Sequence, residues 1–148
     1  MSHEIVIYGF IVGSAWRRED YRKYQRMNVE IIRRTPVDAQ WPYLTPEMFS
    51  SPDPDDSLAT FRRQVIHFGA STKEHGDEYV QEWIPKFECL LGQLYWHSAT
   101  AHIKTETFGA YKYEWMEDAE WRKADGKFVT NLDIDELPPT SRWTRRTA

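Results

Sequence analysis

The sequence predicts a single α+β domain: a four-stranded mixed sheet in β-α-β-α-β-β order, with two helices packed on one face. Its 148 residues suit one domain with a substantial core. Strand-like apolar runs alternate with two segments of helical periodicity. The last two strand-like runs are separated only by a short turn signal, so they must pair antiparallel.

The first strand is expected over residues 4–12, where an apolar, β-branched run ends at Gly13. A continuous apolar run predicts a central strand that is covered on both faces. A helix should follow from about Ala15 to Arg34, because apolar side chains recur there with a period of 3.6 against a row of arginines. Pro36 disfavours helical geometry in the residue before it and ends this helix.

A long proline-rich loop is predicted over residues 35–60, which contain five of the chain's eight prolines. Loops of this length are uncommon in compact domains and are usually functional or mobile. Residues 41–49 are apolar enough to pack on the domain as an arm, whereas residues 50–56 should form a solvated acidic tip.

A second strand is expected over residues 61–70, and a second helix from Gly76-Asp77 to about Leu94. The helix has the strongest amphipathic pattern in the chain, although Pro85 lies inside it and should kink or divide it. On this helix Cys89 is expected in the core and Glu88 at a solvated edge.

The third strand is expected over residues 97–107, where small apolar and polar side chains alternate. Residues 111–115 should return as its hairpin partner after a turn at Phe108-Gly109, and a small second hairpin could pair residues 120–123 with 127–130. A single layer of helices would leave the polar side of residues 98–106 open. Residues 1–136 would form the domain, and residues 137–148 a loose, flexible tail.

Composition excludes several classes of protein. Lys+Arg 19 against Asp+Glu 23 gives a net charge of −4, with a pI near 5.7, which makes a general nucleic-acid binder unlikely. The start of the sequence has no signal-peptide pattern and no membrane span, and one cysteine cannot form an internal disulfide. These features predict a cytoplasmic protein without a membrane association, and no motif calls for a metal or a cofactor.

Charge and aromatic residues are unevenly distributed. Residues 16–34 carry a net charge of +4 and residues 114–136 a net charge of −5. Tryptophans in loops are less easily explained by a core, and aromatic rings amid acidic residues suit a basic protein surface. The expected partner-binding residues are Trp41, Trp115, Trp121, Asp53, Asp55, Asp56, Glu117 and Asp118. Trp115 could instead pack in the core, and Trp143 of the tail is a further candidate for partner contact.

No complete catalytic motif is present. The alternative to protein binding is a small enzyme or ligand-binding domain with a pocket on the polar side of residues 98–106. His102 and Glu106 would be its acid/base pair, since residues four apart on a strand share one face. The ligand-binding set would be Tyr8, Arg62, Gln64, His67, His102 and Glu106. A third alternative is RNA contact through the basic helix at residues 16–34, with Arg22, Arg26 and Arg33 as the contacting residues.

The segments Arg62–Gly69, Trp83–Leu91 and Trp96–Glu106 resemble small bacterial or phage proteins of unassigned role, some of which are similar to immunity proteins of toxin systems. The resemblance implies a cytosolic inhibitor without catalysis of its own. We therefore expect a non-enzymatic protein-binding module, an inhibitor or immunity-type protein, whose partner is a toxin or enzyme with a basic surface. Association with further copies of the same chain is left open.

Overall fold

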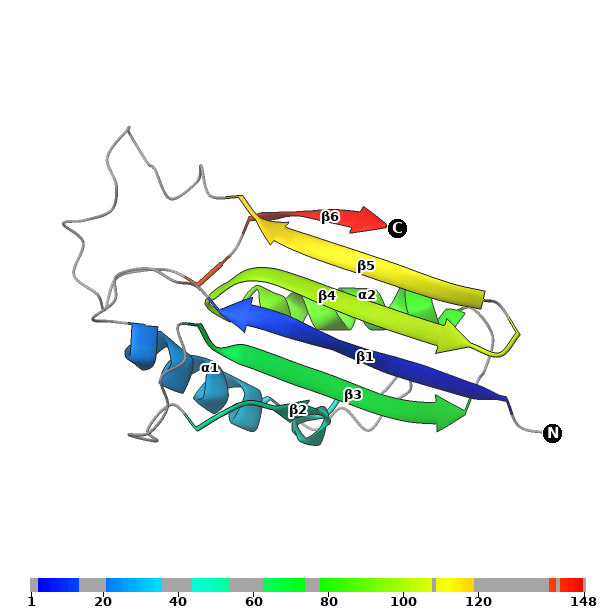
Figure 1. Cartoon of the computed structure of the whole chain (residues 1–148), viewed down its shortest axis with the longest axis horizontal. Coiled ribbons are helices and arrows are strands. Elements are labelled where there is room, and N and C mark those ends of the chain that lie inside the picture. The colour runs from blue at the N-terminus through cyan, green and yellow to red at the C-terminus, as the bar shows by residue number, and fades with distance from the viewer. Residues whose placement is uncertain are drawn as a thin grey trace.

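A computed structural model describes residues 3–13, 21–35, 44–53, 63–73, 78–107, 109–118, 139–140 and 142–147. Its elements, in chain order, are β1 (Glu4–Gly13), α1 (Tyr21–Arg34), the 3₁₀ turn η1 (Pro46–Met48), β2 (Phe49–Ser50), β3 (Val65–Lys73), α2 (Glu78–Leu91), β4 (Trp96–Thr105), β5 (Gly109–Glu117) and β6 (Trp143–Thr147). The α+β class with two helices is confirmed (Figure 1).

The sheet has six strands in the order β2-β3-β1-β4-β5-β6, and every neighbouring pair is antiparallel. The predicted four-stranded mixed sheet is therefore wrong in number and in direction. Two short edge strands were missed: β2 lies inside the proline-rich loop, and β6 lies in the segment that we expected to be a loose tail.

The direction of β3 explains the remaining difference. The Gly13 amide donates to the Gln64 carbonyl oxygen, so the chain re-enters the sheet beside the point where β1 ends. The chain therefore leaves β1 and enters β3 at the same end of the sheet, which makes the two strands antiparallel. A parallel β3 would have had to begin at the opposite end. The connection from β3 through α2 to β4 is a crossover, because it passes β1 and joins two strands that both run opposite to it.

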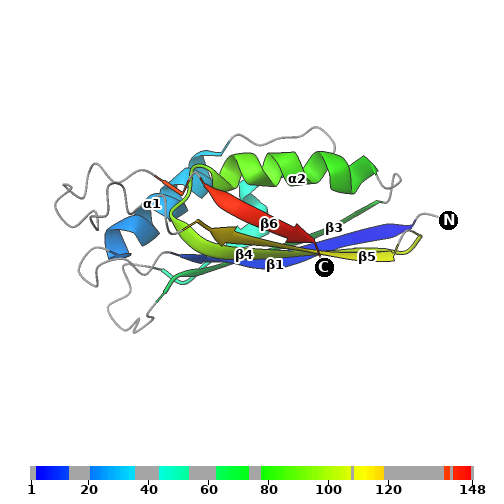
Figure 2. The same cartoon turned by 90° about the horizontal axis from the view of Figure 1, so that it is seen from above.

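Both helices lie on one face of the sheet, as expected (Figure 2). The predicted apolar stripe of α2 is buried throughout, at Val80, Trp83, Ile84, Phe87, Leu90, Leu91 and Leu94. The helix is continuous through Pro85, which lies on its exposed side. The sequence expectation for Cys89 is wrong, since its side chain is exposed.

A buried polar contact holds α1 against the sheet. Asn28 is 1% exposed; its side-chain amide donates to the Tyr95 carbonyl oxygen (2.9 Å), and its oxygen accepts from the Tyr95 amide (2.8 Å). The same amide nitrogen donates to the Gln64 side chain, which in turn donates to the Gln25 carbonyl oxygen. The Asn28 side chain therefore satisfies both Tyr95 backbone groups where β4 begins, and Gln64 links the start of β3 to the backbone of α1, as buried polar groups require.

The centre of the sheet is packed most tightly at Gly9 of β1. A Cβ atom there would overlap the Thr100 carbonyl oxygen and lie 2.7 Å from the ring of Phe68, which crosses above the glycine on the helix side. Gly69 of β3 faces the opposite side of the sheet, and a Cβ there would lie 3.4 Å from its nearest neighbour, in ordinary contact. The two glycines therefore differ in the space around them.

We expect Gly9→Ala to lower the free energy of unfolding by about 3 kcal/mol, because the methyl group would force the Phe68 ring and the β4 backbone apart. Gly69→Ala is the matched control and should change it by less than about 1 kcal/mol. Urea denaturation of both variants measures the difference. Equal losses in the two variants would contradict this packing.

Candidate functional site

The face of the sheet opposite the helices is open over the described residues, and Figure 1 looks onto it. The register places its side chains in rows that run across β3, β1, β4 and β5. Four complete rows are Val65–Val12–Ser98–Met116, His67–Phe10–Thr100–Glu114, Gly69–Tyr8–His102–Lys112 and Ser71–Val6–Lys104–Ala110. We call these sixteen positions the open face.

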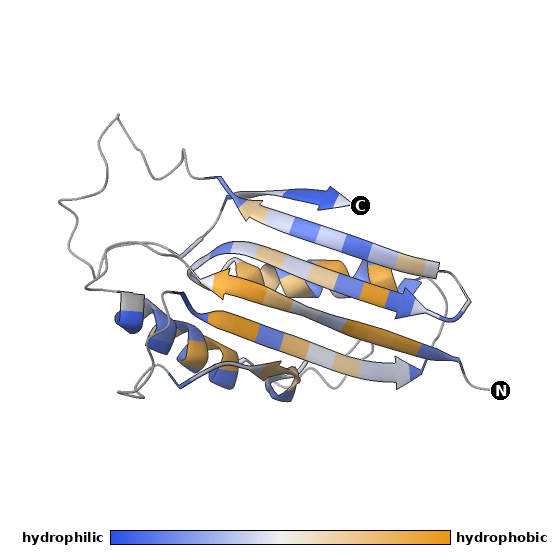
Figure 3. Ribbon diagram, viewed as in Figure 1, coloured by the Kyte–Doolittle hydropathy of each residue, from blue (hydrophilic) through white to orange (hydrophobic). Residues whose placement is uncertain are grey.

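The middle of the open face is apolar because β1 is apolar on both sides. On the helix side Ile5, Ile7 and Ile11 are at most 1% exposed. On the open side Tyr8 and Phe10 are 37% and 38% exposed, and Met116 of β5 is 51% exposed. Figure 3 shows the apolar colour along β1 and the hydrophilic colour along much of β5 and β6. The expectation that β1 is covered on both faces is therefore met on one face only.

Aromatic and basic side chains are stacked beside this apolar strip. The Tyr8 and His102 rings are parallel, with centroids 4.8 Å apart and planes at 11°, and Lys104 Nζ lies 5.5 Å from the Tyr8 centroid. On the other flank of Tyr8 the facing residue is Gly69, which has no side chain to cover the tyrosine. A partner with an apolar or aromatic group would find contact area here.

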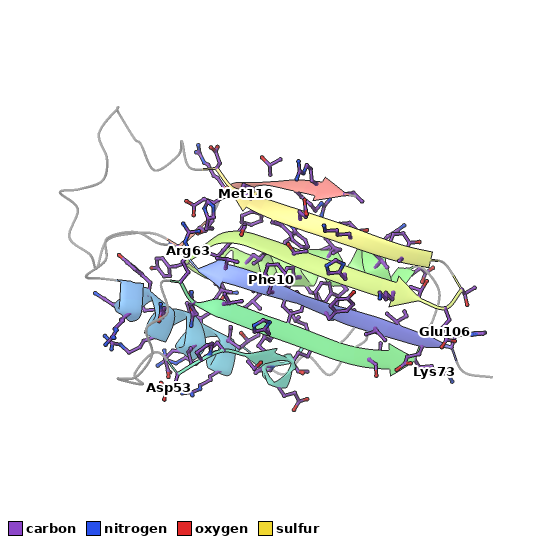
Figure 4. All side chains as sticks on the ribbon, in the orientation of Figure 1. Phe10, Asp53, Arg63, Lys73, Glu106 and Met116 are labelled. Atoms are coloured by element: carbon purple, nitrogen blue, oxygen red, sulfur yellow. The ribbon has the colours of Figure 1, made fainter. Side chains whose placement is uncertain are left out.

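The rim of the open face carries charges of both signs. Glu114 binds Lys112 Nζ (3.0 Å) and Arg146 Nη2 (2.8 Å) from β6, and the Arg146 hydrogen bond, followed by that of Lys112, holds the pKa of Glu114 below its ordinary value. At one end of the sheet His3 Nδ1 lies 3.0 Å from Glu106 Oε2, close to Lys73. Figure 4 shows Phe10 near the middle, Glu106 and Lys73 at this end, and Arg63 at the other.

His97 lies where β4 shifts its register against β1, at the same end as Arg63. Burial, followed by the positive charge of Arg63, lowers the pKa of His97 below its ordinary value. The imidazole is therefore held neutral at physiological pH, and protonation below about pH 6.5 would oppose folding.

The sequence-predicted ligand site assembles only in part. Tyr8, His67 and His102 share the open face, but Gln64 is buried against Asn28 on the other side, and Arg62 lies outside the described residues. Glu106 lies in the turn that follows β4, and it pairs with His3. Among the described residues, no group of three or more His, Cys, Asp or Glu side chains could hold a metal ion.

The sequence-predicted partner residues that the structure describes are not brought together. Trp115 is 1% exposed and belongs to the core, and Glu117 is buried against Thr140. Asp53 and Asp118 are exposed but lie far apart, because Asp53 follows β2 at one edge of the sheet and Asp118 follows β5 near the other edge. Trp41, Trp121, Asp55 and Asp56 lie outside the described residues, as do the hairpin proposed for residues 120–130 and the start of the basic segment at residues 16–20.

Glu88 of α2 joins the helix layer to the last two strands, contrary to the expectation of a solvated edge. Its carboxylate accepts the indole N–H groups of Trp115 (3.0 Å) and Trp143 (3.2 Å), and binds Arg145 Nη1 at 2.8 Å. The Trp143 ring also packs on Trp96. This contact explains why residues 143–147 form a strand, and it positions Arg146 on the open side of the sheet.

Sequence reasoning missed the contribution of β5 and β6 to this face. The signal was present, because Ala110, Lys112, Glu114 and Met116 alternate with the aromatic residues that were assigned to packing. The role of β6 could not have been predicted in the same way, because nothing in the sequence indicates that Glu88 of α2 binds Trp143 and Arg145 of β6.

No protein-family model, no curated protein and no solved structure matches this chain. Among the described residues, no helix is long and apolar enough to cross a membrane.

We expect Glu88→Ala to lower the free energy of unfolding by about 2 kcal/mol, because it leaves the buried Trp115 N–H without an acceptor and releases Trp143 and Arg145. Glu82→Ala, at an exposed position of the same helix, is the control and should change stability by less than about 0.5 kcal/mol. Hydrogen exchange should also show faster exchange of the β6 amides in Glu88→Ala alone. Equal stability in both variants, with β6 still protected, would contradict the role of Glu88.

Proposed function

We propose that this chain is a protein-binding module and that the open face of the sheet is its binding surface. The observation that carries the proposal is the composition of β1, which is apolar on both sides although the helices cover only one. Contiguous exposed apolar area at the centre of a charged rim is the usual anatomy of a protein–protein interface.

The charge of the open face favours a protein over a nucleic acid. Its four rows contain Lys104, Lys112 and Glu114, with Arg146 beside them, so both signs are present within one face. Nucleic-acid affinity depends on an excess of positive charge that can neutralise phosphates. A mixed rim around an apolar middle instead suits a protein surface with a similar mixture.

The proposed binding surface differs from the one predicted from the sequence. The acidic segment and its tryptophans are replaced by Tyr8 and Phe10 at the centre of the open face and by Met116 toward its β5 edge. The narrower expectation of an inhibitor or immunity-type protein concerns the identity of the partner, and it stays a prediction.

A second candidate function is a small-ligand site over Tyr8. It is favoured by the Tyr8–His102 stack and by Gly69 opposite, which together leave an aromatic surface beside an exposed lysine. A planar ring could stack there. The crosslinking experiment below separates the two candidates, because a small ligand would yield no polypeptide adduct.

A photoreactive benzoylphenylalanine placed at position 100 tests the proposal, since Thr100 lies beside Phe10 in the middle of the open face. In cells of its native source, illumination should link it to a second polypeptide. The additional change Phe10→Lys should reduce the adduct at least about tenfold, because it places a charge in the apolar centre.

The control carries the same photoreactive residue at position 81, where Gln81 is exposed on α2, on the far side of the sheet. It should give no such adduct. Equal adducts from positions 100 and 81, or an adduct at position 100 that survives Phe10→Lys, would contradict a binding role for the open face.

A further inference from the structure

We infer that the partner that covers the open face is a second copy of this chain, packed face to face about a two-fold axis that runs parallel to the strands between β1 and β4. This inference rests on the proposed function and adds the identity of the partner. It follows from which side chains of the open face would face one another in such a dimer.

A two-fold axis in this position keeps each residue at its level along the strands and reverses the order of the strands. Strand β1 of one copy then faces β4 of the other, and β3 faces β5. Each row therefore meets the same row of the second copy in the opposite direction. The register defines every pair that would result.

The resulting pairs place the apolar side chains of β1 on the smaller polar side chains of β4, since Val12 meets Ser98 and Phe10 meets Thr100 of the second copy. The outer pairs add contacts of matching size and charge. In the first row the apolar Val65 meets Met116 of the second copy, and in the second row His67 meets Glu114. In the third row the bare position at Gly69 meets the long side chain of Lys112, and Tyr8 meets His102. The fourth row opposes Ser71 with Ala110 and Val6 with the aliphatic stem of Lys104. None of these four rows opposes two like charges.

Charge balance also permits a second copy and disfavours a partner of one strong sign. A patch that meets itself must carry both signs, because a patch of one sign would repel its own copy. The Lys112–Glu114–Arg146 group carries both signs on the open side of β5 and β6. A partner of strongly basic or acidic character would instead be matched by a face of one sign.

The area is adequate for a stable dimer. Four strands about 4.8 Å apart and nine residues long span roughly 20 Å by 30 Å, or about 600 Å² before the relief of the side chains is counted. Two such faces bury about 1,200 Å² in total, at the lower end of the range of about 1,200–2,000 Å² for specific interfaces. Two sheets packed in this way would lie about 10 Å apart with their strands within about 30° of parallel.

The mass of the protein in solution gives the first test. Light scattering should report 35.2 kDa, twice the chain mass of 17.6 kDa, falling toward one chain on dilution. Phe10→Lys should raise the dimer dissociation constant at least about thirtyfold. Gln81→Lys, which adds the same charge on α2, should leave it unchanged. A single chain at every concentration, or a dimer that Phe10→Lys does not weaken, overturns the inference.

Crosslinking between singly substituted chains tests the axis itself. In a Cys89→Ser background, which removes the exposed native thiol, Val65→Cys chains are mixed with Met116→Cys chains and treated with a short bismaleimide. The mixture should yield a crosslinked heterodimer. Val65→Cys mixed with Ala110→Cys is the control and should not, because Ala110 lies three rows away, about 20 Å along the strands. Equal yields from the two mixtures contradict the axis.

The result also separates this inference from the proposed function. A monomeric protein whose position 100 crosslinks to a different polypeptide keeps the binding role of the open face and rejects the second copy. A monomeric protein with no adduct at position 100 rejects both.

Discussion

The position of β1 at the centre of the sheet is the constraint on which the rest of the structure depends. It pairs with β3 on one side and β4 on the other over nearly its whole length. At Gly9 the missing side chain lets Phe68 lie across the strand, and Phe68 in turn contacts Trp83 and Phe87 of α2. The register of β1 therefore decides both the packing of the helix layer and the composition of the face on the other side.

The outer strands depend on a different kind of contact. Strand β6 is short, and four of its five residues are exposed. It is held by two indole N–H groups and one guanidinium, from β5 and β6, that converge on Glu88, a partly buried acceptor on α2. The carboxylate thus replaces the apolar burial that the residues of β6 cannot provide, and it extends the charged rim of the open face through Arg146.

Much of the fold was predictable because periodicity reports burial directly. The stripe of α2, the alternation of β4 and the apolar run of β1 all appear in the structure within a few residues of their expected bounds. Strand direction was not predictable, since it depends on where the chain re-enters the sheet after residues 14–64. The edge strands were missed because each is short and is held by contacts distant in the sequence, such as Glu88 with Trp143. The same limit applies to the candidate site. The sequence predicts that the polar side of β4 is open, but it also predicts that β1, the apolar centre of the open face, is buried on both sides.

The apolar outer side of β1 is accounted for if a second chain covers it. Oxidation of Met116 by hydroxyl radicals, measured across a dilution series, tests this most directly, because its thioether is both exposed and reactive in the single chain. The proposed packing predicts that Met116 is protected at high protein concentration and becomes oxidised faster on dilution. An oxidation rate that does not change with concentration, in a protein that stays folded throughout, would contradict it.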